Sequence, residues 1–145
     1  MFFARAERPV RYALVARYGF EMGREATAEA FAYAWEHWDR VGRMENPDGY
    51  TYRVGQRLAR RWAGRKTAGF GAPPDHAEVV VEPKLRPALE RLSPRQRVTV
   101  VLVSGLGWTH REAADFQGIS TSSVQKHLER ALNRLRTEIG VDLET

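Results

Sequence analysis

Seven polar side chains near the end of the sequence have the composition of a surface that reads DNA. Short hydroxyl side chains come first and longer donors follow: Thr121, Ser122, Ser123, Gln125, Lys126, His127 and Arg130. Hydroxyls and the amides of a helix N-terminus bind phosphate oxygens, whereas the longer side chains reach base edges or a further phosphate. The cluster is therefore a candidate recognition surface for the major groove.

A helix-turn-helix over residues 107–136 is expected to position this cluster. Thr109 opens the first helix and Glu112 follows three residues later, which is the spacing of a capping box. Gly118 stands where a residue of positive φ is needed, and Ser120 is placed to cap the second helix. An ordinary helical hairpin is the alternative. The joint presence of cap, turn glycine and polar helix start favours DNA binding.

A second candidate surface lies in the first half of the chain. Every charged residue from position 53 to position 66 is basic: Arg53, Arg57, Arg60, Arg61, Arg65 and Lys66. Asn46 and Pro47 predict the cap and first residue of the helix that bears them. Its expected inward face repeats every four residues: Tyr50, Val54, Leu58 and Trp62. Arginine forks suit phosphate oxygens, so a DNA backbone is favoured over a merely solvated basic face.

The composition limits the other classes of function. The chain has 145 residues, no cysteine and a net charge of +5, which excludes disulfides and thiolate metal sites and favours a polyanionic partner. Its four histidines lack metal-ligand spacing, and no nucleophile motif or phosphate loop occurs. No segment reads as a signal peptide or a membrane span. We therefore expect a cytoplasmic protein without metal, cofactor, catalytic residues or membrane insertion.

The helical periodicity predicts an all-α protein of two small helical domains joined by a flexible linker. The domains are expected at residues 1–66 and 84–140, with the proline- and glycine-rich linker at 67–83. Pro9 is expected to start the first helix. The apolar run at 98–103 suits a strand by propensity, but the capped start before it favours a buried helix.

The second half resembles the fourth conserved region of bacterial sigma factors of the sigma-70 family. The resemblance rests on SPRQR, on the G-W-T-x-x-E-A-A…G-I-S-x-x-S-V motif and on the final RALNRLR, over residues 85–136. EATAEAFAYAWEHWDRV and NPDGYTYRVGQRLARRW resemble the second region. Two such domains with a short linker are similar to the small extracytoplasmic-function subgroup, whose C-terminal domain contains the helix-turn-helix.

The resemblance implies a promoter-specificity subunit that acts with the RNA polymerase core. The recognition cluster would read the −35 element of double-stranded promoter DNA. The first half would bind the −10 single strand through Arg43, Met44, Asn46, Arg53, Arg57, Arg60 and Arg61. Glu25 and Glu29 would contact the polymerase, with Phe31 and Trp35 behind them in the domain core. An anti-sigma factor is a further partner that the family permits.

Several residues depart from the family pattern, and other functions stay open. Ala28 replaces a glutamine in the polymerase-contacting helix, and Gln125 and His127 replace a lysine and an arginine in the recognition helix. A stand-alone helix-turn-helix regulator is the alternative reading. An enzyme with a helical DNA-binding tail is a remote third one, because no catalytic group of residues is present.

Overall fold

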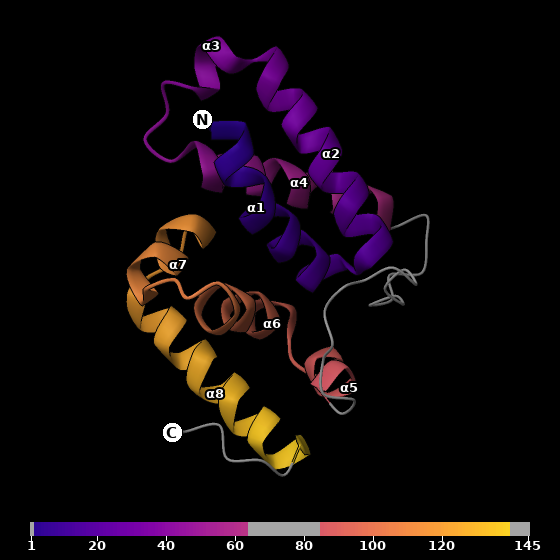
Figure 1. Ribbon diagram of the computed structural model, residues 1–145, viewed down its shortest axis with the longest axis vertical. Helices are drawn as coiled ribbons and strands as arrows, with labels where there is room; N and C mark the ends of the chain where they lie inside the picture. The colour runs from indigo at the N-terminus through magenta and orange to yellow at the C-terminus, as the bar shows by residue number, and fades with distance from the viewer. Residues whose placement is uncertain (1, 64–84, 140–145) are drawn as a thin grey trace.

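The computed structural model describes residues 2–63 and 85–139, so the linker predicted at 67–83 lies outside the described residues. The elements in chain order are α1 (Phe2–Tyr18), α2 (Phe20–Glu36), α3 (Trp38–Val41), α4 (Pro47–Ala63), α5 (Leu85–Glu90), α6 (Pro94–Val100), the π-helical turn η1 (Val101–Gly105), α7 (His110–Gln117) and α8 (Thr121–Ile139). No strand occurs among these residues. The predicted all-α class is confirmed, with α1 to α4 in one group and α5 to α8 in the other (Figure 1).

Small residues allow the first three long helices to approach closely. The alanines at their contacts are 0–1% exposed: Ala6, Ala13, Ala26, Ala30, Ala34 and Ala59. A side chain at Gly23 would place its Cβ 2.5 Å from the Cα of Val15, so α2 crosses α1 at backbone distance there. The alanine-rich sequence of α2 thus fixes how tightly this half packs.

The two halves share one core across α1, α4, α6 and α7. Buried residues from both belong to a single apolar cluster: Val10, Ala13, Leu14, Ala16, Met22, Ala26, Tyr52 and Ala59, with Val98, Leu102, Ala113, Ala114, Phe116 and Val124. α1 packs on α6 and η1, and α4 packs on α7 (Figure 1). Ala88, Leu92, Val100, Ala131 and Leu135 form a second cluster between α5, α6 and α8. The second half is therefore seated on the first.

The prediction that Pro9 starts the first helix is wrong, because α1 begins at Phe2 and Pro9 lies inside it. An internal proline costs roughly 3 kcal/mol in a helix. Phe2 offsets this cost by burial: its ring lies 5.0 Å from Trp38 and 6.0 Å from Phe31, centroid to centroid. Ala6, in the next turn, is also fully buried. Tertiary packing thus overrides the local signal.

The predicted inward face of α4 is also displaced. The buried residues are Gly49, Thr51, Tyr52, Val54, Gly55 and Ala59, while Tyr50, Leu58 and Trp62 are only half-buried. Gly55 explains the shift, because the side chain of Leu14 fills the space that a Cβ would occupy, 2.5 Å from its Cδ1. A glycine gives no apolar signal, so the buried stripe could not be recognised from hydrophobicity alone.

The apolar run at 98–103 is helical, as predicted. Ser93 caps α6 in a complete capping box with Gln96, in which each side chain accepts from the other residue's backbone N–H. Val98 and Leu102 are fully buried in the shared core. The run ends in the wider turn η1, before Gly107 at φ 73°. Burial on several sides therefore decides against the strand that β-branched residues suggest.

Candidate nucleic-acid interface

The helix-turn-helix forms as the sequence predicts. Thr109 Oγ1 accepts from the N–H of Glu112 at 3.0 Å, and Glu112 Oε1 accepts from the N–H of Thr109 at 2.9 Å. Gly118 is left-handed at φ 71°, ψ 36°, and the N–H of Ile119 donates to Ala114 O at 3.0 Å. These bonds satisfy the terminal amides and carbonyls of α7 and aim the N-terminus of α8 outward.

The predicted recognition cluster lies on the first turns of α8, and most of it is exposed. Thr121, Ser122, Gln125, Lys126 and Arg130 are exposed, as a groove-reading surface requires. Ser123 is half-buried, and its backbone N–H donates to Ser120 Oγ at 3.1 Å. Two hydroxyls, those of Ser122 and Ser123, also lie within hydrogen-bond distance of Ser120 Oγ. Ser123 therefore belongs more to the cap than to the open surface.

His127 is the member of the cluster that differs most from expectation. Its side chain is half-buried, and its Nδ1 is buried without a hydrogen bond among the described residues. Burial lowers the pKa of His127, and the positive charges of Arg95 and Arg130 lower it further. A neutral imidazole at neutral pH offers one ring N–H as a donor instead of a second cation.

The basic row on α4 is partly exposed and partly covered. Arg57, Arg60 and Arg61 are exposed on the later turns. Arg53 is half-buried, and its Nη1 lies 3.3 Å from the position that a Cβ on Gly118 would occupy. The turn of the helix-turn-helix therefore sits beside the first of the four arginines. Arg65 and Lys66 lie outside the described residues.

A groove of about 290 Å³ between α2 and α4 brings two predicted sites together. Glu29 and Glu36 line one wall, and Arg57 and Arg61 line the other. The apolar part of the lining comes from Ala32, Tyr33, Val54 and Leu58. The predicted polymerase contact at Glu29 and the predicted phosphate contacts on α4 thus share one surface depression.

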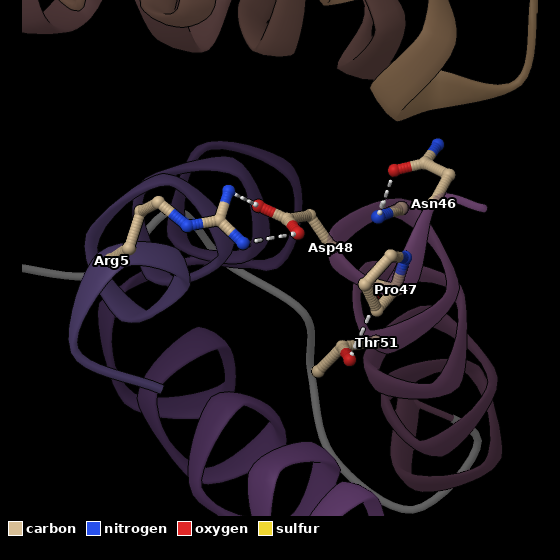
Figure 2. A network of polar contacts seen from close by, with 6 residues as sticks. Arg5, Asn46, Pro47, Asp48 and Thr51 are labelled. Carbon is tan, nitrogen blue, oxygen red and sulfur yellow. Dashed lines mark hydrogen bonds and ion pairs between the residues drawn. The ribbon is translucent and has the colours of Figure 1, made fainter. Parts of the chain in front are cut away.

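Asn46, predicted to hold a −10 base, makes two contacts of its own. Its Oδ1 accepts from the N–H of Gly49 at 3.0 Å and so caps α4, and its Nδ2 donates to the backbone oxygen of Asp115 in α7 at 2.7 Å. Figure 2 shows this corner, where Arg5 also pairs with Asp48 at 3.3 Å. Arg43 is exposed and Met44 is half-buried in the same loop. The end of the loop is therefore tied to the helix-turn-helix, and the first turn of α4 is tied to α1.

Arg40 forms a cluster with two tyrosines that sequence reasoning missed. It donates to Tyr33 OH at 2.7 Å and to Tyr50 OH at 3.4 Å, just before the predicted −10 loop. The hydrogen bond from Arg40 lowers the pKa of Tyr50, and a hydrogen bond with Tyr33 lowers it further. No spacing rule signals this cluster, because its members come from α2, α3 and α4. It anchors the start of the loop against both long helices.

The exposed face of α2 holds Glu25 and Glu29, both exposed as predicted. The expectation that Trp35 lies in the domain core is wrong, because its side chain is 71% exposed, and Trp38 is 38% exposed. Phe31 is half-buried against the core. Trp35 lies ten residues after Glu25, about 80° short of three full turns, so it stands at the edge of the outer face. The Phe3 ring, centred 5.5 Å from it, covers only one side.

The described residues hold no group of three or more histidine or acidic side chains placed for a metal ion. No described helix is long and apolar enough to cross a bilayer.

Comparison with known proteins places the second half in a family. Residues 84–135 match the model of sigma-70, region 4. Over 50 residues the chain is 46% identical to the ECF RNA polymerase sigma factor SigG of Mycobacterium tuberculosis, in strains CDC 1551 / Oshkosh and H37Rv. The aligned part is 34% of this chain but only 14% of SigG, so the likeness to that protein concerns one segment.

The fold is similar to a solved sigma factor over nearly the whole chain. The structure is that of the sigma factor RpoE in complex with the anti-sigma factor NepR from Bartonella quintana. The TM-score is 0.72 at 18% identity, with 97% of this chain and 95% of that chain covered. The likeness therefore extends across both helical groups. The match to sigma-70, region 4 covers residues 84–135, and the likeness to the solved structure concerns the fold of both groups.

Proposed function

We propose that the chain is a sigma factor of the extracytoplasmic-function type, which directs core RNA polymerase to specific promoters in the cytoplasm and has no catalytic activity of its own. The observation that supports this most is the region 4 match over residues 84–135. The first helical group precedes it in the sequence and carries a row of arginines on α4. A stand-alone regulator needs the helix-turn-helix but not that row, nor the acidic face of α2.

The −35 binding site in this proposal is the N-terminal part of α8. Its exposed hydroxyls and amides bind phosphates, and Gln125 and Lys126 enter the major groove. Each charged phosphate contact makes the slope of the logarithm of the association constant against the logarithm of the salt concentration more negative by about 0.9. Ser123 and His127 are half-buried and contribute less to the exposed surface of α8. Gln125, Lys126 and Arg130 therefore remain as the longer side chains that contact DNA.

The −10 binding site in this proposal is the loop before α4 together with the α4 arginines. Arg57, Arg60 and Arg61 bind the backbone, while Arg43, Met44 and Asn46 stand where an unstacked base would be held. Arg53 joins them once the turn at Gly118 moves away from it. Binding of this kind needs no reaction chemistry, only contacts that are stronger to the opened strand than to the duplex.

Glu25 and Glu29 are the polymerase-facing residues of the proposal. Both are exposed on α2, and Trp35 is exposed at the edge of that face, where a large exposed aromatic ring offers an anchor for a protein partner. An anti-sigma factor is a second protein partner in this proposal, because RpoE, whose fold is similar, was crystallised with one.

In vitro transcription tests the proposal directly. Purified core polymerase is supplied with the full chain and a pool of promoter fragments, and the RNA start sites are sequenced. We expect new start sites, each preceded by shared −35 and −10 sequences, only when both proteins are present. If the chain binds duplex DNA tightly by itself and core gains no start-site specificity from it, the stand-alone regulator is the correct reading.

The polymerase contact is tested by charge reversal at Glu25→Lys and Glu29→Lys. We expect the double variant to weaken binding to core at least tenfold while leaving binding to a −35 duplex unchanged. Asp39→Lys is the matched control, since Asp39 is an exposed acid on the neighbouring helix α3. Equal affinity of all three proteins for core would remove the assigned role of the two glutamates.

A further inference from the structure

We propose that the groove between α2 and α4 holds one guanine base, and that Glu36 distinguishes guanine from the other bases. This inference rests on the proposed function and names a base that the −10 surface would select. It begins from the mixed charge of the groove. The carboxylates of Glu29 and Glu36 line one wall, the guanidinium groups of Arg57 and Arg61 line the other, and apolar side chains lie between them.

The charged side chains of this groove have no partners in the part of the chain that the structure describes. The ion pairs and hydrogen bonds formed there include none of the four: Glu29, Glu36, Arg57 and Arg61. Opposite charges therefore line a space of about 290 Å³ without closing it. A ligand with donors on one edge and acceptors on the next would satisfy both walls at once.

Glu36 is the carboxylate best placed to accept from such a ligand. It is the exposed last residue of α2, and the last turn of this helix has no basic residue. A negative charge is unfavourable at the C-terminal end of a helix, because the free carbonyl groups there are partly negative. Donors from a ligand would offset this cost. Glu29 lies about two turns earlier on α2 and stays available for the polymerase.

Tyr33 gives the groove a fixed aromatic wall, one turn before Glu36 on the same helix. Its hydroxyl accepts from Arg40 at 2.7 Å, and its ring stacks on His37 with the centroids 4.2 Å apart. These contacts hold the ring in place, so little side-chain entropy is lost when a base packs against it. Contact with an aromatic ring favours every base, which leaves the choice among bases to the charged walls.

The groove lies beside the surface predicted to bind the −10 strand. Arg40 joins Tyr33, in the groove, to Tyr50 in the first turn of α4. The hydrogen bond from Arg40 and the nearby charge of Arg57 both lower the pKa of Tyr50, so Arg57 stands close to this end of α4. A strand whose phosphates lie on the α4 arginines therefore has its bases within reach of the groove.

Guanine is the base whose edges match both walls. Its Watson–Crick edge carries two donors, N1–H and the N2 amino group, which one carboxylate accepts as a pair. Its O6 and N7 are two acceptors, to which one arginine donates as a pair. Adenine and cytosine offer a carboxylate only one amino group, and thymine offers one N–H. Glu36 together with Arg57 would therefore select guanine.

Single-strand binding by the full-length chain tests this assignment. The probes are fluorescein-labelled thymidine 12-mers in which one central position is dG, dA, dC or deoxyinosine, and anisotropy reports their binding. Deoxyinosine lacks only the N2 amino group of guanine. We expect the dG strand to bind about fivefold more tightly than the dA, dC and all-thymidine strands, and about threefold more tightly than the deoxyinosine strand.

Glu36→Gln removes one of the two acceptors and keeps the shape of the side chain. We expect this variant to bind the dG and deoxyinosine strands equally, and to bind the all-thymidine strand at least as tightly as wild type does. Glu21→Gln is the matched control, because Glu21 is an exposed acid in the first turn of α2 and does not line the groove. It should keep the full preference for dG. A merely structural role of Glu36 would weaken all strands alike.

Competition with guanosine monophosphate identifies where the base comes from. If the free nucleotide does not displace the dG strand, the groove reads guanine as part of a strand; if it does, the same guanine site also takes a free nucleotide. Equal binding of all strands, binding of none, or a dG preference that survives Glu36→Gln overturns the inference. Promoter-specific transcription with core would then still support the proposed function, and its absence overturns that function whatever the strands show.

Discussion

Tyr52 is the residue whose environment gives the sharpest pH prediction. It is 1% exposed in the shared core, and burial raises its pKa from 10.0 to about 12, against the opposing positive charge of Arg17. The unfolded chain therefore loses this proton first as the pH rises. The stabilisation is complete below pH 10 and is lost between pH 10 and about 12, a change of roughly 3 kcal/mol.

Urea unfolding at pH 8 to 12 checks this expectation, with Tyr52→Phe as the comparison. The variant keeps the stack on Phe116 and lacks the ionisable hydroxyl, which accepts from Gln56 Nε2 at 3.3 Å. Its free energy of unfolding should fall less steeply than that of wild type above pH 10. Parallel pH profiles for the two proteins would mean that Tyr52 is not the titrating group.

Local signals predicted single residues well only where their partners are close in sequence. Thr109 with Glu112, and Gly118 at positive φ, depend on the next three or four residues, and they have the geometry expected. Asn46 was predicted only as a cap and a base contact. Its bond to Asp115 crosses between the halves, and no sequence spacing encodes it. The outward position of Trp35 also depends on which face α1 covers.

At the scale of the element, the turn of the helix-turn-helix depends on Gly118. Its φ of 71° is left-handed, which costs a residue with a Cβ about 1–2 kcal/mol. We expect Gly118→Ala to lower the free energy of unfolding by that amount, and Gly118→Asn to lower it less, because asparagine tolerates this conformation. Thermal and urea denaturation of the full chain measure the change.

Gly105 gives the matched control on the same half of the chain. It is not among the residues at positive φ, and a Cβ there would meet nothing within 4 Å. Gly105→Ala should therefore change the free energy of unfolding by less than about 0.5 kcal/mol. Equal losses at Gly105 and Gly118 would show that the left-handed turn is not the origin of the effect.

Elements with caps or strong periodicity could be predicted, and elements set by packing could not. The helices α6, α7 and α8 follow from their caps and turn residues. The start of α1 before Pro9 depends on Phe2, which gains its energy only once α2 and α3 supply Phe31 and Trp38. The buried stripe of α4 depends on Gly55, whose value lies in the space it leaves for Leu14.

At the scale of the whole molecule, the prediction of two helical groups is confirmed, and the packing adds a core that both groups share. The helices fall into two groups, but Tyr52 and Phe116 join them in one core that includes Val10 and Val98. A composition break at residues 67–83 predicts where the chain can be divided, not whether the parts then associate. That association depends on shape at α4 and α7, where Gly49 admits the α7 backbone.

A shared core leads us to expect that both halves unfold in one cooperative transition. Trp108 reports on the second half, and Trp35, Trp38 and Trp62 report on the first, so Trp108→Phe leaves only first-half fluorescence. The urea midpoint of this variant's fluorescence should coincide with the midpoint of its helical circular dichroism. Unfolding either half exposes the apolar surface of the other, so the two halves unfold together.

Arg97→Gln supplies the contrast to this single transition. With the bridge from α6 to α1 removed, the fluorescence and circular dichroism midpoints should separate, because the two groups of helices then unfold more independently. Arg91→Gln, whose pairing with Glu138 stays inside the second half, should keep them together. Separate midpoints already in the chain with an intact Arg97 would mean that the contact between α4 and α7 is too weak to join the two groups of helices in one unfolding transition.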